Sequence, residues 1–208
     1  MDIIDKLSEV FKEFPGIGER QARRFVYFLM YKNSTYTENL SMLLSDLKKE
    51  VAQCRECFRF FIMDKGKTPP KDGQVCDICA SINIDSSTLL VVEKDSDLES
   101  VKKSRVYNGK YFILGGLVPI VEKNTKSRVR IEELKKKISD SKELKEIILA
   151  FSLNPQGDHT DLYVREQIKD LAEKSGIKIS SLGKGLSTGT ELEYSDNDTL
   201  KNALKNRQ

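Results

Sequence analysis

The chain has 208 residues with a net charge of +3; 38% of the residues are hydrophobic and 32% are charged. This composition predicts a soluble folded protein of one to three domains, and the net charge alone is too small to indicate a nucleic-acid partner. No hydrophobic run approaches the ~18 residues of a membrane-spanning helix, and the acidic start MDIIDKLSEVFKE predicts no cleaved signal peptide, so we expect a cytoplasmic protein without membrane contact.

Residues 1–53 are predicted to form a small helical domain. Hydrophobic residues recur at helical spacing in residues 3–11, in residues 22–29 and again from Leu40 to Val51. The three resulting hydrophobic stripes can bury one another. We therefore expect three helices packed together.

The sequence FPGIG at 14–18 separates the first two helices and matches the turn of a helix-hairpin-helix module. Gly16 and Gly18 allow a close backbone approach and leave N–H groups at the start of the next helix to face a phosphate. Three arginines follow on that helix, and these are Arg20, Arg23 and Arg24. We expect these groups to bind the DNA backbone without reading bases. The alternatives are a plain helical turn with solvated arginines and a hairpin that binds only protein.

Residues 54–80 contain four cysteines with the spacing C-x2-C-x18-C-x2-C. They are Cys54, Cys57, Cys76 and Cys79. Cysteine pairs in a cytoplasmic protein more often bind metal than form disulfides, and this spacing is typical of a four-thiolate zinc site. Because sulfur would take all four positions of the tetrahedron, we expect about one structural Zn²⁺ per chain. The alternatives are four unrelated thiols and a redox-active pair.

Residues 81–181 alternate between predicted strands and helices. Strands are expected at 88–92, 111–114, 146–151 and 177–180, and helices are expected at 96–104, 131–139 and 160–174. This alternation predicts a parallel α/β sheet. The tail, residues 182–208, is expected to form a turn, a short strand and a last helix that begins at Asp196 or Asn197.

Two of the predicted strands end in polar residues that could form a site. Glu93 follows the first strand, and SLNPQGD at 152–158 follows the third. This pairing resembles the Toprim domain of topoisomerases and primases, in which a glutamate, a D-x-D motif and an E-G-E motif hold magnesium. The D-x-D positions here are the neutral Ser152 and Asn154, so only Glu93 and Asp158 remain as acids. We expect a Toprim-like fold without metal chemistry; the alternative is a metal-dependent Toprim nuclease or primase-like enzyme.

The single histidine, His159, follows directly after this segment. A lone histidine beside acids could act as a general base. No serine or cysteine motif typical of a nucleophile accompanies it, and we expect an exposed loop residue instead.

The order of the modules resembles the RecR family of recombination mediators over essentially the whole chain. The matching segments are FPGIGERQARRFVYFLM (14–30), the cysteine pairs, LLVVEKDSDLESV (89–101), YFILGGLVPI (111–120), EIILAFSLNPQGDHT (146–160) and the tail at 183–207. The resemblance implies a non-enzymatic DNA-repair protein that acts with RecO and, in many bacteria, RecF to load RecA onto single-stranded DNA coated by single-strand binding protein. It also implies a homo-oligomer, either a dimer or a tetrameric ring, held by the helical domain and the C-terminal segment.

The same resemblance assigns candidate sites. Arg20 and Arg24 correspond to DNA-contacting positions, and the four cysteines correspond to zinc ligands. Glu93 corresponds to the Toprim glutamate, and we expect a partner protein to dock on the Toprim face formed by Glu93, Asn154 and Asp158. The DNA partner would be single-stranded, duplex or gapped DNA without sequence preference. A scaffold that binds only proteins is a third interpretation.

The sequence thus predicts an α+β fold in four parts. Residues 1–53 form a helix-hairpin-helix domain, and residues 54–80 form a four-cysteine zinc finger. Residues 81–181 form a Toprim-like α/β domain with a parallel sheet, and residues 182–208 form a C-terminal strand–helix segment.

Overall fold

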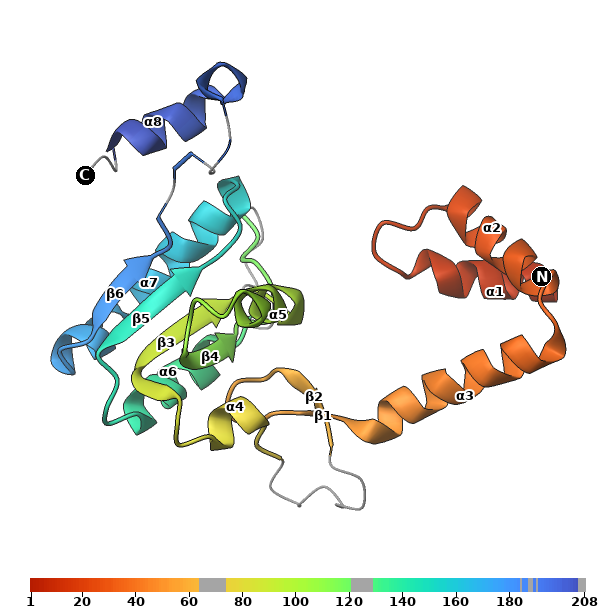
Figure 1. Ribbon diagram of the computed structural model, residues 1–208, viewed down its shortest axis with the longest axis horizontal. Coiled ribbons are helices and arrows are strands. Elements are labelled where there is room, and N and C mark those ends of the chain that lie inside the picture. The colour runs from red at the N-terminus through yellow and green to blue at the C-terminus, as the bar shows by residue number, and fades with distance from the viewer. Residues whose placement is uncertain (64–73, 121–128, 184, 187–188, 190, 206–208) are drawn as a thin grey trace. The chain divides into compact units, whose positions relative to one another are not determined.

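The computed structural model describes all residues except 64–73, 121–128, 184, 187–188, 190 and 206–208 (Figure 1). The described chain divides into two compact units. The first contains Met1–Ala52 with Ile62 and Met63, and the second contains Gln53–Phe61 and the described residues from Gln74 onward. Among the described residues, no helix combines the length and the hydrophobicity that crossing a membrane requires.

The first unit consists of three helices, as expected. They are α1 (Ile3–Lys12), α2 (Glu19–Met30) and α3 (Ser34–Glu50). Asp2 caps α1 by accepting a hydrogen bond from a main-chain N–H of the first turn, and Asn33 caps α3 in the same way.

Helices α1 and α2 form a hairpin around small and aromatic side chains. Ala22 and Val26 of α2 are buried, and so is Ser8 of α1. The rings of Phe11 and Phe25 meet edge to face, 5.7 Å apart between centroids. The hydrophobic stripes of the first two helices therefore pack against each other, as the sequence predicts, although Ile3 and Val10 of α1 stay exposed.

The prediction that the third stripe is also buried is wrong. No residue of α3 is buried, and Leu43, Leu44 and Leu47 each expose more than half of their surface. The helical spacing correctly predicts a helix, but α1 and α2 already pack face to face, and no other described element packs extensively along α3. The stripe on α3 is left open in a single chain.

The second unit is built on a four-stranded sheet in the order β4-β3-β5-β6. The strands are β3 (Asp85–Val92), β4 (Gly109–Ile113), β5 (Glu146–Ala150) and β6 (Lys178–Ser181). All three pairings between neighbouring strands are parallel. The expected parallel α/β sheet is confirmed.

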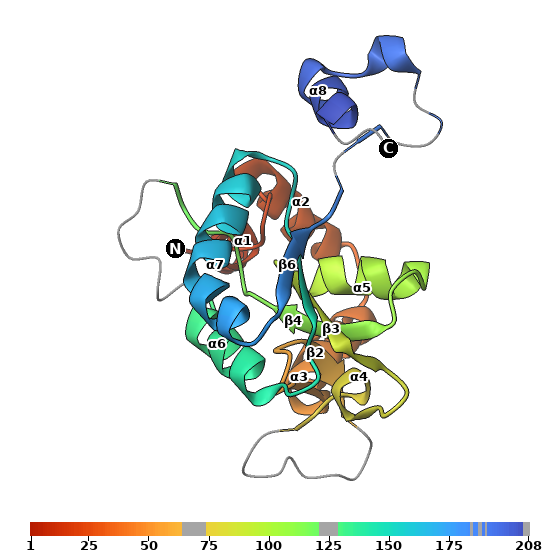
Figure 2. The same ribbon diagram turned by 90° about the vertical axis from the view of Figure 1, so that its left-hand side faces the viewer.

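Helices cover both faces of this sheet (Figure 2). Helices α6 (Ile131–Asp140) and α7 (Pro155–Lys174) lie on one face, and α5 (Asp95–Ser104) lies on the other. Side chains of β3 alternate between the two cores: Leu89 and Val91 pack with α6 and α7, whereas Leu90 and Val92 pack with α5.

Two details differ from the sequence prediction. Helix α7 begins at Pro155 and not at residue 160, because Asn154 caps it and proline suits the first helical position. His159 therefore lies inside a helix and is half-buried, so the prediction of an exposed loop residue is wrong.

In the tail, Leu192–Tyr194 form a 3₁₀ helix where the sequence predicts a short strand. A strand needs a neighbouring strand for its hydrogen bonds, and no described strand pairs with this segment. Helix α8 (Asn197–Lys205) follows. Asp196 caps it by accepting a hydrogen bond from Thr199 N at 2.8 Å.

Candidate functional site

The four cysteines form one cluster in the second unit. Cys54 and Cys57 lie on the turn between two short strands, β1 (Val51–Gln53) and β2 (Phe60–Ile62), and Cys76 and Cys79 lie on the short helix α4 (Asp77–Ala80) or at its start. The sequence prediction overlooked these three elements, which are too short to show a periodicity. The four Sγ atoms all lie within 4.8 Å of one another, so they could hold a metal ion.

The geometry of the cluster suits a tetrahedral metal ion. A metal–sulfur bond of about 2.3 Å in a tetrahedron places sulfur atoms about 3.8 Å apart. The Sγ atoms of Cys57 and Cys76 are 3.6 Å apart. Three of the four cysteines are fully buried, so the cluster is shielded from solvent on most sides.

The electrostatics of the cluster also favour a cation. The main-chain N–H groups of Glu56 and Cys76 each donate to Cys54 Sγ at 3.4 Å, which stabilises a thiolate there. Hydrogen bonds with the other three thiols lower the pKa of Cys54. Hydrogen bonds with its own three neighbouring thiols, together with burial, raise the pKa of Cys79. Four thiols at this distance cannot all ionise unless a cation balances their charge.

The loop that carries the first cysteine pair is attached to the sheet by its main chain. Ile113 N, at the end of β4, donates to Cys57 O at 2.9 Å. Phe60 N donates to Asp95 Oδ1 at 2.7 Å, at the start of α5. The ring of Phe58 packs edge to face on a ring of β4. The cysteine loop is therefore a part of the α/β unit.

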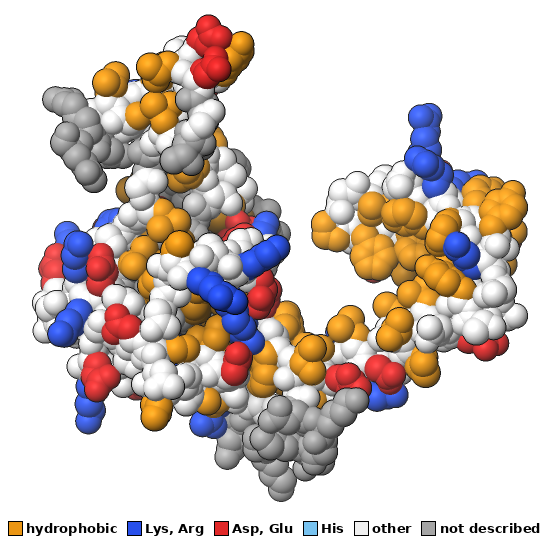
Figure 3. Space-filling view, viewed as in Figure 1, with side chains coloured by type: hydrophobic (Ala, Val, Ile, Leu, Met, Phe, Trp, Pro, Cys, Tyr) orange, Lys and Arg blue, Asp and Glu red, His pale blue; other side chains and the backbone are white. Residues whose placement is uncertain are grey.

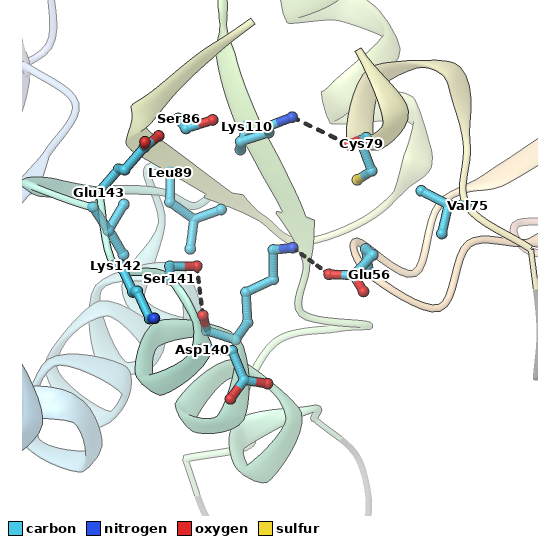
Figure 4. A pocket seen from close by; sticks show the side chains of 12 residues that line it. Glu56, Val75, Cys79, Ser86, Leu89, Lys110, Asp140, Ser141, Lys142 and Glu143 are labelled. Atoms are coloured by element: carbon cyan, nitrogen blue, oxygen red, sulfur yellow. Dashed lines mark hydrogen bonds and ion pairs between the residues drawn. The ribbon is translucent and has the colours of Figure 1, made fainter. Parts of the chain in front are cut away.

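Two lysines extend this attachment beside a pocket of about 490 Å³ (Figure 4). Lys110 of β4 donates to three main-chain carbonyls at the end of α4, at 3.2–3.3 Å. Lys137 of α6 forms an ion pair with Glu56 at 2.9 Å and is mostly buried. Lys110 thus holds the end of α4, and Lys137 holds the loop of the first cysteine pair. Sequence reasoning missed these contacts, because they join residues far apart along the chain.

The hairpin turn in the first unit leaves the start of α2 open. Gly16 has a φ of +78°, which favours glycine. Gly18 is the N-cap residue of α2, and no side chain caps that helix. A Cβ added at Gly18 would meet nothing within 4 Å. The first N–H groups of α2 can therefore face an anion.

The three arginines after this turn differ in how their charge is used. Arg23 Nη2 bonds to Asp5 Oδ1 at 3.1 Å, so its charge is offset by a carboxylate of α1. Arg24 bonds only to the neutral Gln21 among the described side chains, and Arg20 forms no ion pair within the described chain. Sequence reasoning missed the contact with Asp5, which joins two helices. The charges of Arg20 and Arg24 are therefore available to a ligand.

The carboxyl edge of the sheet brings two of the predicted positions together. Ser152 Oγ donates to Glu93 Oε2 at 3.2 Å, so the loops after β3 and β5 meet. The side chain of Asn154 accepts a hydrogen bond from a main-chain N–H of α7 and serves as its cap. Asp158 lies exposed in the first turn of the same helix.

In the described part of the chain, no group of acids at this edge could hold a metal ion. Among the described residues, the four cysteines are the only group of three or more His, Cys, Asp or Glu side chains that could hold a metal ion. Magnesium is usually held by oxygen ligands, carboxylates first among them. Because Ser152 and Asn154 are neutral, the two positions that are aspartates in the Toprim motif carry no carboxylate here.

Comparisons with known proteins cover nearly the whole chain. A family described as Toprim domain matches residues 87–183, and one described as RecR, C-terminal, matches residues 185–208. The chain is 33% identical over 205 residues to Recombination protein RecR of Bacteroides thetaiotaomicron, covering 99% of this chain and 93% of the relative. It is 32% identical over 204 residues to the protein of the same name from Lactobacillus acidophilus, covering 98% of this chain and 96% of the relative. It is also 32% identical to that of Dehalococcoides mccartyi over 205 residues, or 99% and 93% of the two chains.

The two glycines of the hairpin turn are expected to respond to substitution in opposite ways. Gly16→Ala places a side chain at a left-handed φ and should lower the unfolding free energy by about 1 kcal/mol. Gly18→Ser has space, an extended backbone and a hydroxyl that can cap α2, so it should raise the unfolding free energy by some tenths of a kcal/mol. Urea denaturation followed by circular dichroism measures both. Equal effects of the two substitutions would contradict the described turn.

Proposed function

Because the chain belongs to the RecR family of recombination proteins, we propose that it is a non-enzymatic DNA-binding mediator of recombination repair. It forms an oligomeric clamp or adaptor on DNA. Together with RecO, and with RecF in bacteria that have it, it helps to load RecA onto single-stranded DNA coated by single-strand binding protein.

The observation that carries the DNA-binding proposal is the uncapped start of α2 beside two available arginines. Phosphate can accept hydrogen bonds from the first N–H groups of the helix, after Gly18. Arg20 and Arg24 lie on the following turns and add charge without a competing carboxylate. These contacts hold the sugar–phosphate backbone and are independent of sequence. Arg23 contributes less, because it is already paired with Asp5.

The cysteine cluster is proposed to hold one structural Zn²⁺. The short distances between sulfurs, the N–H donors to Cys54 and the burial of three ligands support zinc, which prefers four thiolates in a closed tetrahedron. Zinc would supply a cross-link between the turn after β1 and helix α4. With sulfur in every position, the site leaves no place for a substrate.

Exposed hydrophobic surface supports assembly into an oligomer. Leu43, Leu44 and Leu47 form an open stripe on α3, and a large exposed patch of this kind is typical of an interface. Helix α8 at the other end of the chain also exposes Leu204. Several subunits around one DNA molecule would combine individually weak contacts into stable binding.

The carboxyl edge of the sheet is proposed to dock a partner protein. Asp158 is exposed there, and Leu153, in the turn that Asn154 ends, exposes 66% of its surface. Glu93 is mostly buried and forms an ion pair with Lys94 at 3.9 Å. An acidic surface with an exposed leucine suits a basic and apolar segment of a partner. The paired Ser152 and Glu93 hold the two loops of this surface together.

Removal of metal tests the structural site. We expect about one zinc per chain by elemental analysis and a large fall in the unfolding temperature when a chelator removes it. Cys57→Ser should lose stoichiometric zinc, whereas Ser86→Ala, which alters the wall of the neighbouring pocket, should keep it. A metal-free protein with an unchanged unfolding temperature would contradict the structural role.

Charge reversal tests DNA binding. Arg20→Glu with Arg24→Glu should weaken binding of gapped DNA at least tenfold at ~50 mM salt and reduce the slope of log K against log salt by about 2, because two phosphate contacts are lost. Lys169→Glu, at an exposed position of α7, is the matched control and should change the affinity by less than about twofold. Unchanged binding by the double variant would favour the scaffold that binds only proteins.

The same samples test the proposal that the protein is not an enzyme. With magnesium present, the DNA strands should remain intact, because Ser152 and Asn154 carry no charge to hold the ion. Denaturing gels of the bound DNA give the measurement. Magnesium-dependent cleavage that disappears in Glu93→Gln would overturn the proposal and establish the alternative, a Toprim nuclease.

A further inference from the structure

Two arginines and two tyrosines line the side of α2 that faces away from α1. Arg20, Arg24, Tyr27 and Tyr31 are spaced four, three and four residues apart, so a helix of 3.6 residues per turn aligns them on one face. Tyr31 keeps helical backbone angles as the C-cap residue. The buried Ala22 lies on the opposite face of the helix. We call these four residues the Arg–Tyr stripe.

The two tyrosines of the stripe are open to solvent. Tyr27 exposes 46% of its surface and Tyr31 exposes 91%, and neither ring contacts another ring within the described chain. The neighbouring Phe28 and Tyr36 behave differently, because they meet edge to face and Lys32 lies over both rings. Figure 3 shows hydrophobic side chains and Lys or Arg side chains side by side over the α1–α2 hairpin.

We propose that the Arg–Tyr stripe binds single-stranded DNA, with Arg20 and Arg24 on phosphates and the rings of Tyr27 and Tyr31 stacked on bases. Exposed aromatic rings next to a basic track are the recurring device of single-strand binding, since every base has a π-face. The bases of a duplex are already stacked and paired, so only an unpaired strand can use the rings. The inference rests on the proposed DNA binding by the hairpin and extends it from the backbone to the bases.

The geometry of the stripe suits successive nucleotides of one strand. A rise of 1.5 Å per residue separates the Cα atoms of Tyr27 and Tyr31 by about 6 Å along the helix axis. The arginines lie on the same face toward the uncapped start of the helix, where the phosphate contacts are proposed. A strand can thus run along α2, with its backbone held at one end and its bases stacked at the other.

Charge complementarity favours nucleic acid over a second copy of this chain as the occupant. The stripe carries two positive charges and no acidic residue, and Arg20 and Arg24 have no carboxylate partner in the described chain. A polyanion satisfies both guanidinium groups and both rings at once.

A ring-removing double variant tests the inference in the full-length protein. Tyr27→Leu with Tyr31→Leu should bind an oligothymidine of about 20 nucleotides at least tenfold more weakly, because base stacking contributes roughly a factor of ten per base. Its affinity for a duplex of the same length should stay within about twofold of the unsubstituted protein. Tyr27→Phe with Tyr31→Phe keeps both rings and should retain single-strand binding. Leu162→Ala removes an exposed hydrophobic side chain of α7 in the α/β unit and is the control.

A stacking signal and the assembly state complete the test. The fluorescence of 2-aminopurine in the oligonucleotide should be quenched by the unsubstituted and phenylalanine proteins and not by the leucine variant. Sedimentation should give the same mass for all three proteins. A mass change in the leucine variant would identify the stripe as a subunit interface and overturn the inference.

The outcomes separate this inference from the proposed function. The leucine variant could bind single strands as well as the unsubstituted protein, or it could lose single-strand and duplex binding equally. Either result shows that the Arg–Tyr stripe does not stack on bases. The proposal that the hairpin binds the DNA backbone would still stand. If the unsubstituted protein binds neither DNA, the proposed function itself fails.

Discussion

The packing of the cysteine cluster against the sheet is the contact on which the rest of the second unit depends. Cys54, Cys57 and Cys76 are buried in the same core as Leu90 and Val92 of the central strand β3. The cysteine loop and α5 together cover one face of the sheet, whereas α6 and α7 cover the other. A cation in the cluster would thus hold together half of a hydrophobic core, and through the bond from Phe60 N to the first turn of α5 it would support the loop that presents the carboxyl edge.

Much of this fold could be predicted from the sequence, because buried parallel strands are short hydrophobic runs that allow few other interpretations. The predicted strands and most of the helices of the α/β part begin within a few residues of the observed ones, and the exception, α7, begins five residues early at an Asn-Pro pair that resembles a loop. Helical periodicity predicts α3 equally well, yet it cannot say what covers Leu43 or Leu47. Periodicity describes one helix, whereas burial depends on a partner.

The sites show the same division between local and long-range information. Cysteine spacing is a local pattern, and the four thiols do come together as a cluster that could hold a metal ion. The pairing of Arg23 with Asp5 joins two helices, so no local pattern could reveal that one of three similar arginines has its charge offset. Helical spacing places Tyr27 and Tyr31 on one helix, but their exposure depends on α1, which packs on the opposite side.

The turn after β5 has a consequence for how this chain could change over evolutionary time. A Cβ at Gly157 would collide with Ser152 O, so the glycine keeps the turn tight, and Ser152 stays in contact with Glu93. A change of Ser152 to aspartate would place a second carboxylate against that of Glu93, and without a cation between them their repulsion would weaken the turn. A neutral residue at position 152 therefore allows the tight turn to form without a bound cation.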